Sequence, residues 1–351
     1  MNAASPVARE ELHSRTDADA LPRCAPWLIA WGAVTVLLMA VSLGVGTSSI
    51  RTSLEWLMSP DAASNVVLWH IRLPRAIGAW FAGALLGLGG AIAQGLFRNP
   101  LAEPYLLGSP SGAALGVTLG LLAADASLSG LAWTGALGVT GCAFAGACLA
   151  IALTLALSRG VLQTAGLLLA GIVVAFLLSA VTSLLLLRSP ETWRAMQAFL
   201  LGSTGFLSWR SVTLLMGVFV ICAVPTVLLS RGLDALTLGE ETAQSLGISL
   251  PALRLALLTL LSLATATTVA QVGIIGFVGL VAPHLVRESL RVSQRQMLIA
   301  SPLFGGTLLL AADLVSRWVI RPAELPVGVV TACLGGSYLV LLLWRRARNA
   351  Y

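Results

Sequence analysis

Two side chains that could do chemistry, Asp313 and His284, lie inside otherwise apolar stretches of the sequence. A carboxylate in a membrane-spanning stretch is costly unless it is paired or faces a polar path, so Asp313 could serve a proton relay. Arg317 follows at the i,i+4 spacing at which aspartate and arginine pair on one helix face. His284 could bind a metal, but the other histidines, His13 and His70, lie in separate segments. We therefore predict an ion pair at Asp313 and a structural role for His284.

The basic residues exclude several kinds of enzyme. The chain has 21 lysines and arginines together, and all of them are arginine. A P-loop ATPase, a pyridoxal enzyme and a protein kinase each need a lysine. The spans also contain no paired carboxylates and no serine–histidine–acid set, which argues against a membrane enzyme. We expect no enzymatic activity and no bound cofactor or metal. Cysteines without paired metal-ligand spacing stand at Cys24, Cys142, Cys148, Cys222 and Cys333.

Composition places the chain in a membrane. It is 57% hydrophobic and 10% charged, whereas soluble domains have a charged fraction of about a quarter. We predict an all-α polytopic membrane protein with about ten transmembrane helices over residues 27–345, a disordered cytoplasmic tail over 1–26 and a cytoplasmic tail over 346–351. The candidate spans lie near residues 27–47, 76–97, 105–124, 131–157, 161–187, 211–230, 255–272, 277–290, 297–319 and 325–344.

The segments between these spans have predicted structures of their own. Glycines, among them Gly273 and Gly276, divide an apolar run over 255–286 that is too long for one span. On the predicted outer side, residues 48–71 carry enough apolar side chains to form a lid on the membrane surface. Residues 188–210 fit a short amphipathic helix.

The largest predicted inner connection, residues 231–253, combines acidic residues with an apolar face. We predict two short helices broken by Gly239 and Gly247, with Thr237 capping a first turn that carries two glutamates. An exposed apolar face on an inner loop indicates a docked protein, although an amphipathic loop lying on lipid is the alternative. The apolar face consists of Leu236, Leu238, Ala243 and Leu246.

The inner end of the second span is predicted to be a rigid corner. Pro100 stops the helix, because it lacks an N–H and its ring clashes with the preceding turn. The amide of Asn99 can bridge neighbouring backbone groups, and Leu101 follows directly.

Four separate motifs follow one another along the chain: R-L-P-R at Arg72–Arg75, F-R-N-P-L-A-E-P at Phe97–Pro104, L-G-E-E-T-A-Q-S-L-G at Leu238–Gly247 and G-F-V-G-L-V-A-P-H-L-V-R at Gly276–Arg287. With these motifs the chain closely resembles the FecCD-type permease subunits of type II ABC importers, which take up vitamin B12, haem or ferric siderophores. The resemblance covers residues from about 27 to 344. It implies the ten-helix permease fold of that family.

The resemblance also implies roles for individual residues. Coupling helices within 234–250 would sit in a cleft of the ATP-hydrolysing subunit, through Leu238, Gly239, Glu240, Ala243, Leu246 and Gly247. A cytoplasmic gate would be formed by Asn99, Leu101, Thr164 and Ala165. Docking of a periplasmic binding protein, whose glutamates meet arginines in the family, would use Arg72, Arg75 and Arg317. Glu324 matches a family motif as well, and we interpret it as a helix cap in preference to a substrate contact.

This sequence departs from the family pattern in two places. A usual aspartate–histidine–arginine step appears as Ser293–Arg295, at an inner turn where it changes little. The usual Gly-Ala-Pro-Phe of the last span appears as Gly335–Tyr338, which affects the pore wall or the bend of the helix.

The resemblance implies the permease subunit of an ATP-binding cassette importer in the bacterial inner membrane, surrounded by lipid and binding no nucleic acid. It would act with a second copy of itself, two ATPase subunits that use ATP and Mg²⁺, and a periplasmic binding protein. An excess of arginine on the side of the chain's start predicts cytoplasmic termini. The substrate would be a ferric siderophore or cobalamin, with haem disfavoured by Tyr105, where haem members often have glycine. The alternative is an ion-coupled secondary transporter, for which only Asp313 offers a coupling site.

Overall fold

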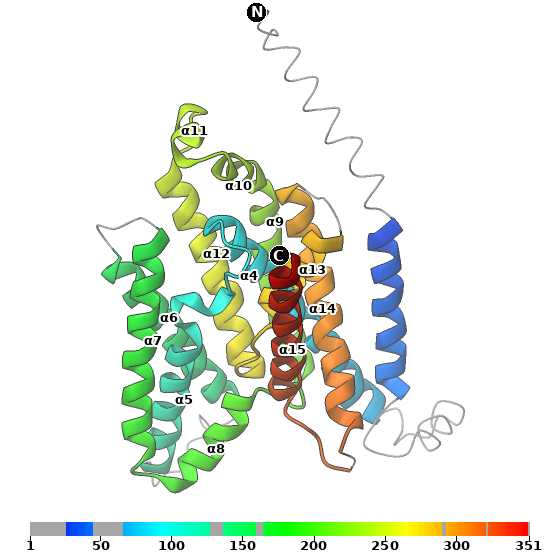
Figure 1. Ribbon diagram of the computed structural model, residues 1–351. Helices are drawn as coiled ribbons and strands as arrows, with labels where there is room; N and C mark the ends of the chain where they lie inside the picture. Colours follow the sequence, from blue (N-terminus) through cyan, green and yellow to red (C-terminus); the bar gives the residue numbers. More distant parts are fainter. Residues whose placement is uncertain are drawn as a thin grey trace, which may run out of the picture.

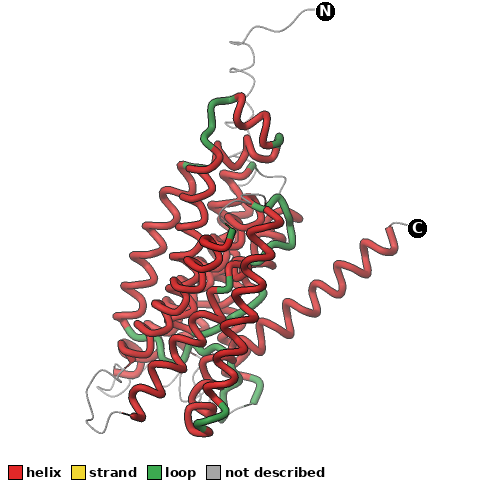
Figure 2. The backbone as a smooth tube through the Cα atoms, turned by 90° about the vertical axis from the view of Figure 1, so that its left-hand side faces the viewer, coloured by secondary structure: helices red, strands yellow, loops and turns green. Residues whose placement is uncertain are grey.

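The computed structural model describes residues 26–44, 66–126, 136–158, 164–289, 293–320 and 322–349. Every regular element in these residues is helical (Figure 2). The predicted tail over 1–26, apart from its last residue, and most of the predicted lid over 48–71 lie outside the described residues.

The described helices follow the predicted spans closely. They are Pro26–Gly44, the π-helix η1 (Leu68–Arg72), α4 (Leu73–Leu96), the 3-10 helix η2 (Pro104–Leu107), α5 (Ser109–Ala126), α6 (Ala136–Leu157), α7 (Thr164–Leu186), α8 (Pro190–Leu201), α9 (Trp209–Leu228), α10 (Ser230–Thr237), α11 (Glu240–Ser245), α12 (Leu250–Val272), α13 (Val278–Ser289), α14 (Gln294–Trp318) and α15 (Val327–Asn349). Seven helical stretches are long and apolar enough to cross a membrane, and the shorter apolar helices Ser109–Ala123 and Val327–Leu342 add to them.

The shortest predicted span, residues 277–290, is found as helix α13 with nearly the predicted bounds. Its 12 residues extend about 18 Å at 1.5 Å per residue, so this helix does not by itself cross a hydrocarbon core of about 30 Å. The preceding chain between Val272 and Val278 is not helical. The predicted division at Gly273 and Gly276 is confirmed. At the other end of the chain, α15 continues to Asn349, into the stretch predicted as a tail.

Helix α4 runs through the middle of the bundle, between α12, α13 and α14 (Figure 1). Glycines allow this close packing, because a Cβ atom at Gly83 would lie 2.3 Å from the carbonyl oxygen of Gly305 in α14. Gly87 has the same relationship to Ser301. The result is a core in which almost every residue of α4 is buried.

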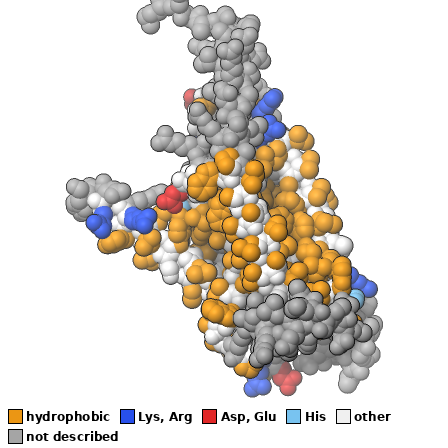
Figure 3. Space-filling model, turned by 90° about the vertical axis from the view of Figure 1, so that its right-hand side faces the viewer, with side chains coloured by type: hydrophobic (Ala, Val, Ile, Leu, Met, Phe, Trp, Pro, Cys, Tyr) orange, Lys and Arg blue, Asp and Glu red, His pale blue; other side chains and the backbone are white. Residues whose placement is uncertain are grey.

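Apolar side chains also cover much of the outside of the bundle. Large hydrophobic residues such as Phe176 in α7 and Leu228 in α9 are exposed, and Figure 3 shows hydrophobic side chains over most of one face, with charged ones near its margins. This is the surface expected for contact with lipid hydrocarbon.

The predicted amphipathic helix over 188–210 is confirmed as α8. Ser189 caps it by accepting a hydrogen bond from the backbone N–H of Thr192. Met196 is buried under the helix, whereas Trp193 and Leu200 are exposed. At the opposite end of the bundle α10 and α11 project beyond the other labelled helices (Figure 1), so the two ends are named here the α8 end and the α10–α11 end.

Candidate functional site: two polar ends of a helical bundle

The α10–α11 pair confirms the prediction of two short helices. Gly239 and Gly247 adopt φ angles of +113° and +82°, in the region that favours glycine, at the start and just past the end of α11. Glu240 and Glu241 occupy the first turn of α11, where negative charge is favoured by the helix dipole. The predicted cap is wrong, since the hydroxyl of Thr237 donates to the carbonyl of Asp234, 2.6 Å away.

Only half of the predicted apolar face of this pair is free. Leu238 and Leu246 are 68% and 63% exposed, whereas Leu236 and Ala243 are buried in the core. The prediction that all four lack a partner is therefore wrong for the two buried residues, because each packs beneath its own short helix. Two leucines project from the end of the bundle.

Polar contacts fasten the α10–α11 pair to the bundle. Glu240 pairs with Arg254 of α12 at 2.7 Å and with Arg98 at 3.4 Å. Asp234 accepts a hydrogen bond from the backbone N–H of Gln294 at the start of α14. The pair is thus connected to three separate segments, one of which is the corner that follows α4.

The corner at residues 97–102 is confirmed as a turn. The side-chain oxygen of Asn99 accepts from the N–H of Leu101 at 2.9 Å, and its carbonyl accepts from Ala102 at 3.0 Å. Arg98 has a φ angle of +48°, which is uncommon for a residue with a side chain. Asn99 and Leu101 are both exposed.

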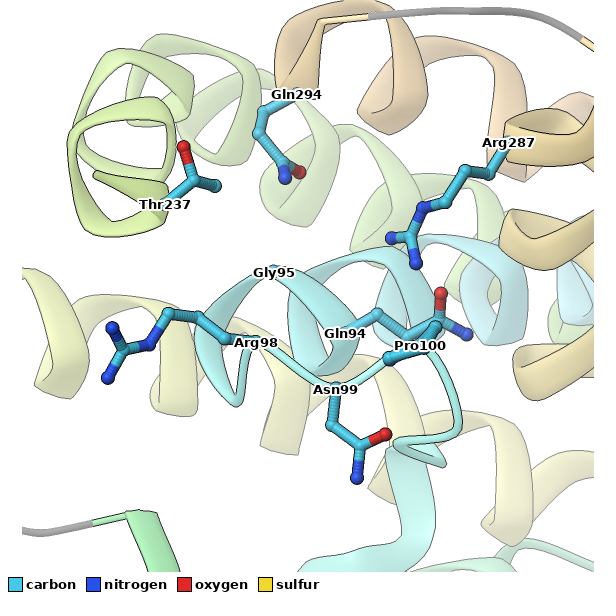
Figure 4. Close-up of a pocket in the computed structure, with 8 residues that line it drawn as sticks. All are labelled: Gln94, Gly95, Arg98, Asn99, Pro100, Thr237, Arg287 and Gln294. Carbon is cyan, nitrogen blue, oxygen red and sulfur yellow. The ribbon is translucent and has the colours of Figure 1, made fainter. Parts of the chain in front are cut away.

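A polar cavity of about 210 Å³ adjoins this corner (Figure 4). Arg287 of α13 points toward the amide of Gln94, whose Nε2 donates to the carbonyl of Leu280 at 3.1 Å. The cavity is lined by Gln94, Gly95, Arg98, Asn99, Pro100, Thr237, Arg287 and Gln294. The cavity brings together the end of α4, helix α10, the last turn of α13 and the first residue of α14.

The second part of the predicted gate has no described side-chain geometry. Helix α7 begins at Thr164, and the side chains of Thr164 and Ala165 lie outside the described residues.

The α8 end contains a buried network centred on Asp313. The carboxylate of Asp313 contacts Arg75 at 2.9 Å and Arg317 at 2.7 Å, which confirms the predicted Asp313–Arg317 pair. The hydroxyl of Thr204 also donates to it. A charge buried at this depth is tolerated because it is paired and hydrogen-bonded.

The three arginines predicted to dock a partner are buried. Arg72, Arg75 and Arg317 are 8%, 9% and 2% exposed. Arg75 and Arg317 contact Asp313. Two of the arginines contact the helix over Pro26–Gly44: Arg72 donates to the carbonyl of Leu43 at 2.7 Å, and Arg317 donates to the hydroxyl of Ser42 at 2.6 Å. Their guanidinium groups thus lie inside the bundle, and docking through these three arginines stays a prediction.

Glu324 is also placed differently from the prediction. Its carboxylate pairs with Arg75 at 3.0 Å, so it closes the network and does not cap α15. Exposed arginines at this end, for which the described residues contain no ion pair, are Arg188, Arg194 and Arg210. Arg188 precedes α8, Arg194 lies in α8, and Arg210 lies at the start of α9.

Two further candidates, His284 and Ser293, have contacts within the bundle. His284 is buried and its ring lies 5.8 Å from that of Tyr338. Among the described residues there is no group of three or more histidine, cysteine, aspartate or glutamate side chains that could hold a metal ion. Ser293, in the first departure from the family pattern, forms a capping box with Gln296 at the start of α14.

Sequence reasoning missed one half-buried acidic residue, Glu103. Its carboxylate accepts from the backbone N–H of Phe277 at 3.2 Å. The A-E-P step of the corner motif was visible in the sequence, but its partner lies 174 residues later and no local spacing indicates it.

The sequence model of the FecCD transport family matches residues 33–345. The vitamin B12 import system permease protein BtuC of Klebsiella pneumoniae is 37% identical over 325 residues, which cover 92% of this chain and 95% of the relative. The same protein of Salmonella paratyphi A is 36% identical over 327 residues, 92% and 96% of the two chains.

Two solved structures are similar to this chain in fold. An inward-facing putative metal-chelate type ABC transporter is 29% identical, covers 92% of this chain and 99% of its own, and superposes with a TM-score of 0.81. PsaBC from Streptococcus pneumoniae, in complex with Fab, is 16% identical, with coverages of 84% and 95% and a TM-score of 0.55, and it supports the fold alone.

Proposed function

Because this chain belongs to the FecCD transport family, we propose that it is the permease subunit of an ATP-binding cassette importer that moves a metal chelate from the periplasm to the cytoplasm. ATP is hydrolysed on separate subunits with Mg²⁺, and this chain has no catalytic role. The single observation that carries the mechanism is the pair of exposed leucines, Leu238 and Leu246, on a helix pair fastened to the corner at Asn99.

The α10–α11 pair is the proposed contact with the ATPase. Leu238 and Leu246 supply the apolar anchors, while Gly239 and Gly247 allow the turns that present them and Glu240 and Ala243 fasten α11 to the bundle. Two ATPase subunits that close around ATP would move this pair. The movement would reach Arg98, because Glu240 contacts both Arg98 and Arg254.

The corner is the proposed gate. Asn99 and Leu101 are exposed on a turn that is connected to α11 through Arg98. In a homodimer they would meet their counterparts beneath the transport path, together with Thr164 and Ala165 at the start of α7.

This assignment fixes the proposed orientation. The α10–α11 end faces the cytoplasm, together with both termini, and the α8 end faces the periplasm across the bacterial inner membrane. A periplasmic binding protein would dock on the α8 end. The buried Arg72, Arg75 and Arg317 would hold the docking surface in shape, and the exposed Arg188, Arg194 and Arg210 would meet carboxylates of the partner.

The proposed substrate is cobalamin or a ferric siderophore, with cobalamin favoured by the relatives named as vitamin B12 permeases. An ion-coupled secondary transporter is not favoured. It would need a buried carboxylate available to the coupling ion, whereas Asp313 is held by two arginines and Glu103 by a backbone N–H.

Reconstitution tests the proposal. The chain would be purified with its ATPase subunit, placed in proteoliposomes and supplied with the binding protein and radiolabelled cobalamin, ferric siderophore or haem. We expect uptake that requires ATP and the binding protein. Uptake that persists without the ATPase and follows a proton or sodium gradient would establish the secondary-transporter alternative instead.

A further inference from the structure

The break between α12 and α13 holds a large side chain in an unfavourable backbone conformation. Helix α12 ends at Val272, Gly273 has a φ angle of +71°, and Phe277 has a φ angle of +69°. A bulky residue in the left-handed region is an outlier, because its Cβ atom crowds the following carbonyl. Such a residue persists only where the surrounding structure fixes it. The contacts around Phe277 therefore carry information about function.

The first of these contacts is with Glu103. The Glu103 carboxylate accepts from the N–H of Phe277 at 3.2 Å, one residue before α13 begins at Val278. A carboxylate is favourable at this place, since the N-terminal end of a helix is partly positive and its first N–H groups lack partners within the helix. Glu103 itself lies only two residues after Leu101. One side chain thus joins the proposed gate to the start of α13.

Close packing strengthens this joint. A Cβ atom at Gly279, in the first turn of α13, would lie 2.4 Å from the ring of Pro104, the residue after Glu103. A Cβ atom at Gly90 of α4 would lie 1.6 Å from the carbonyl oxygen of Gly279. The start of α13 is therefore held between α4 and the segment that follows the corner, with no space for a side chain.

On its other side Phe277 contacts α15. A Cβ atom at Gly335 would lie only 2.3 Å from the Cβ atom of Phe277, whereas one at Gly336 would have nothing within 4 Å. Helix α15 diverges from the rest of the bundle (Figure 2). Phe277 and Gly335 thus lie where this diverging helix meets the break between α12 and α13.

We propose that Glu103 is a positioning residue for transport, which fixes Phe277 and thereby makes the start of α13 and the contact with α15 move together with the gate corner. This inference rests on the proposed function, because it takes Asn99 and Leu101 as the gate. Through Glu103 a displacement of the corner reaches α13 and α15, and through Glu240 the corner is connected to the ATPase-facing pair. The joint would make the gate and the transmembrane helices change state as one unit.

The test compares two substitutions at Glu103 in the complete transporter with its ATPase and binding protein. Glu103→Gln keeps an oxygen that can accept from Phe277, and Glu103→Leu removes it. We expect Glu103→Leu to lower ATP-driven uptake by about tenfold and to reduce the stimulation of ATP hydrolysis by the binding protein. Glu103→Gln is expected to retain both ATP-driven uptake and the stimulation of ATP hydrolysis. Equal losses in the two variants, or wild-type behaviour of Glu103→Leu, would overturn the proposal.

A second pair of variants tests the joint without changing Glu103, in case Glu103→Leu fails to assemble. Gly335→Ala pushes α15 away from Phe277, and the matched control Gly336→Ala adds the same methyl group in open space. We expect Gly335→Ala to assemble with the ATPase but to lose binding-protein stimulation, and Gly336→Ala to behave as wild type. Indistinguishable uptake and stimulation in these two variants would overturn the proposal. The wild-type transporter, measured in parallel, separates this outcome from failure of the proposed function itself.

Discussion

Arg75 in α4 and Asp313 in α14 are joined by two contacts of 2.9 Å, although 238 residues separate them in the chain. Arg317 contacts the second oxygen of the same carboxylate, so one buried carboxylate forms ion pairs with two buried guanidinium groups. This relationship explains why arginines typical of a docking surface are found inside the bundle. They connect α4, α14 and the helix over Pro26–Gly44 at the end that we assign to the periplasm.

Loss of the central carboxylate should destabilise the protein. Asp313→Ala leaves two buried guanidinium groups without their shared partner, and we expect a cost of about 3–5 kcal/mol. The apparent unfolding temperature of the purified protein in detergent measures it. Glu324→Gln is the control, since its pair with Arg75 is partly exposed and contributes about 0–1 kcal/mol. Equal unfolding temperatures for Asp313→Ala and the wild type would show that the network adds no stability.

The ATPase contact should depend on the exposed leucines. Leu246→Glu places a charge in the proposed apolar anchor, so co-purification of the ATPase subunit should fall and uptake should stop while the chain remains inserted. Gln244→Glu adds the same charge on an exposed position of α11 without removing an apolar group and should have a much smaller effect. If the Leu246→Glu variant still hydrolyses ATP in response to the binding protein, α10–α11 is not the coupling element.

Docking should depend on the exposed arginines of the α8 end. Reversal of Arg188, Arg194 and Arg210 to glutamate should weaken capture of the binding protein, most strongly at low salt, where screening is least. Each exposed pair contributes only about 0–1 kcal/mol, so the single variants should be nearly silent. Reversal of Arg72, Arg75 and Arg317 should instead lower the unfolding temperature. Surface binding measurements and thermal unfolding on both triple variants distinguish docking from structural support.

The corner should close across the homodimer. Asn99→Cys or Leu101→Cys, in a background lacking Cys24, Cys142, Cys148, Cys222 and Cys333, should form an intermolecular disulfide that varies with nucleotide state and blocks uptake. The exposure of both residues makes the reaction possible. A crosslink that forms equally in every nucleotide state and leaves uptake intact would identify the corner as a fixed turn.

The contact between α4 and α14 should not tolerate a methyl group. Gly83→Ala would place its Cβ atom 2.3 Å from the carbonyl oxygen of Gly305, and overpacking of this kind costs about 1–3 kcal/mol. Gly217→Ala in α9, where nothing lies within 4 Å, is the matched control and should leave the unfolding temperature unchanged. A similar result for the two variants would mean that the helices separate at little cost.

The sequence was sufficient for the features that depend on local order along the chain. Hydrophobic stretches located the spans, the glycines at 273 and 276 located the break before α13, and Gly239 and Gly247 located the two short helices of the inner loop. Spacing within one helix also predicted the Asp313–Arg317 pair. Each of these follows from backbone geometry or helix periodicity, which neighbouring residues determine by themselves.

Only the tertiary structure decided which charges and apolar groups are free. The sequence predicted that Arg75 docks a partner and that Glu324 caps a helix, whereas in the fold Arg75 pairs with both Asp313 and Glu324. Leu236 was predicted to lack a partner, but its helix packs on the bundle and buries it. The contact of Glu103 with Phe277 was equally invisible in the sequence. Burial and pairing depend on which distant segments meet. No periodicity within a single segment encodes that information, because the partner atoms come from elsewhere in the chain.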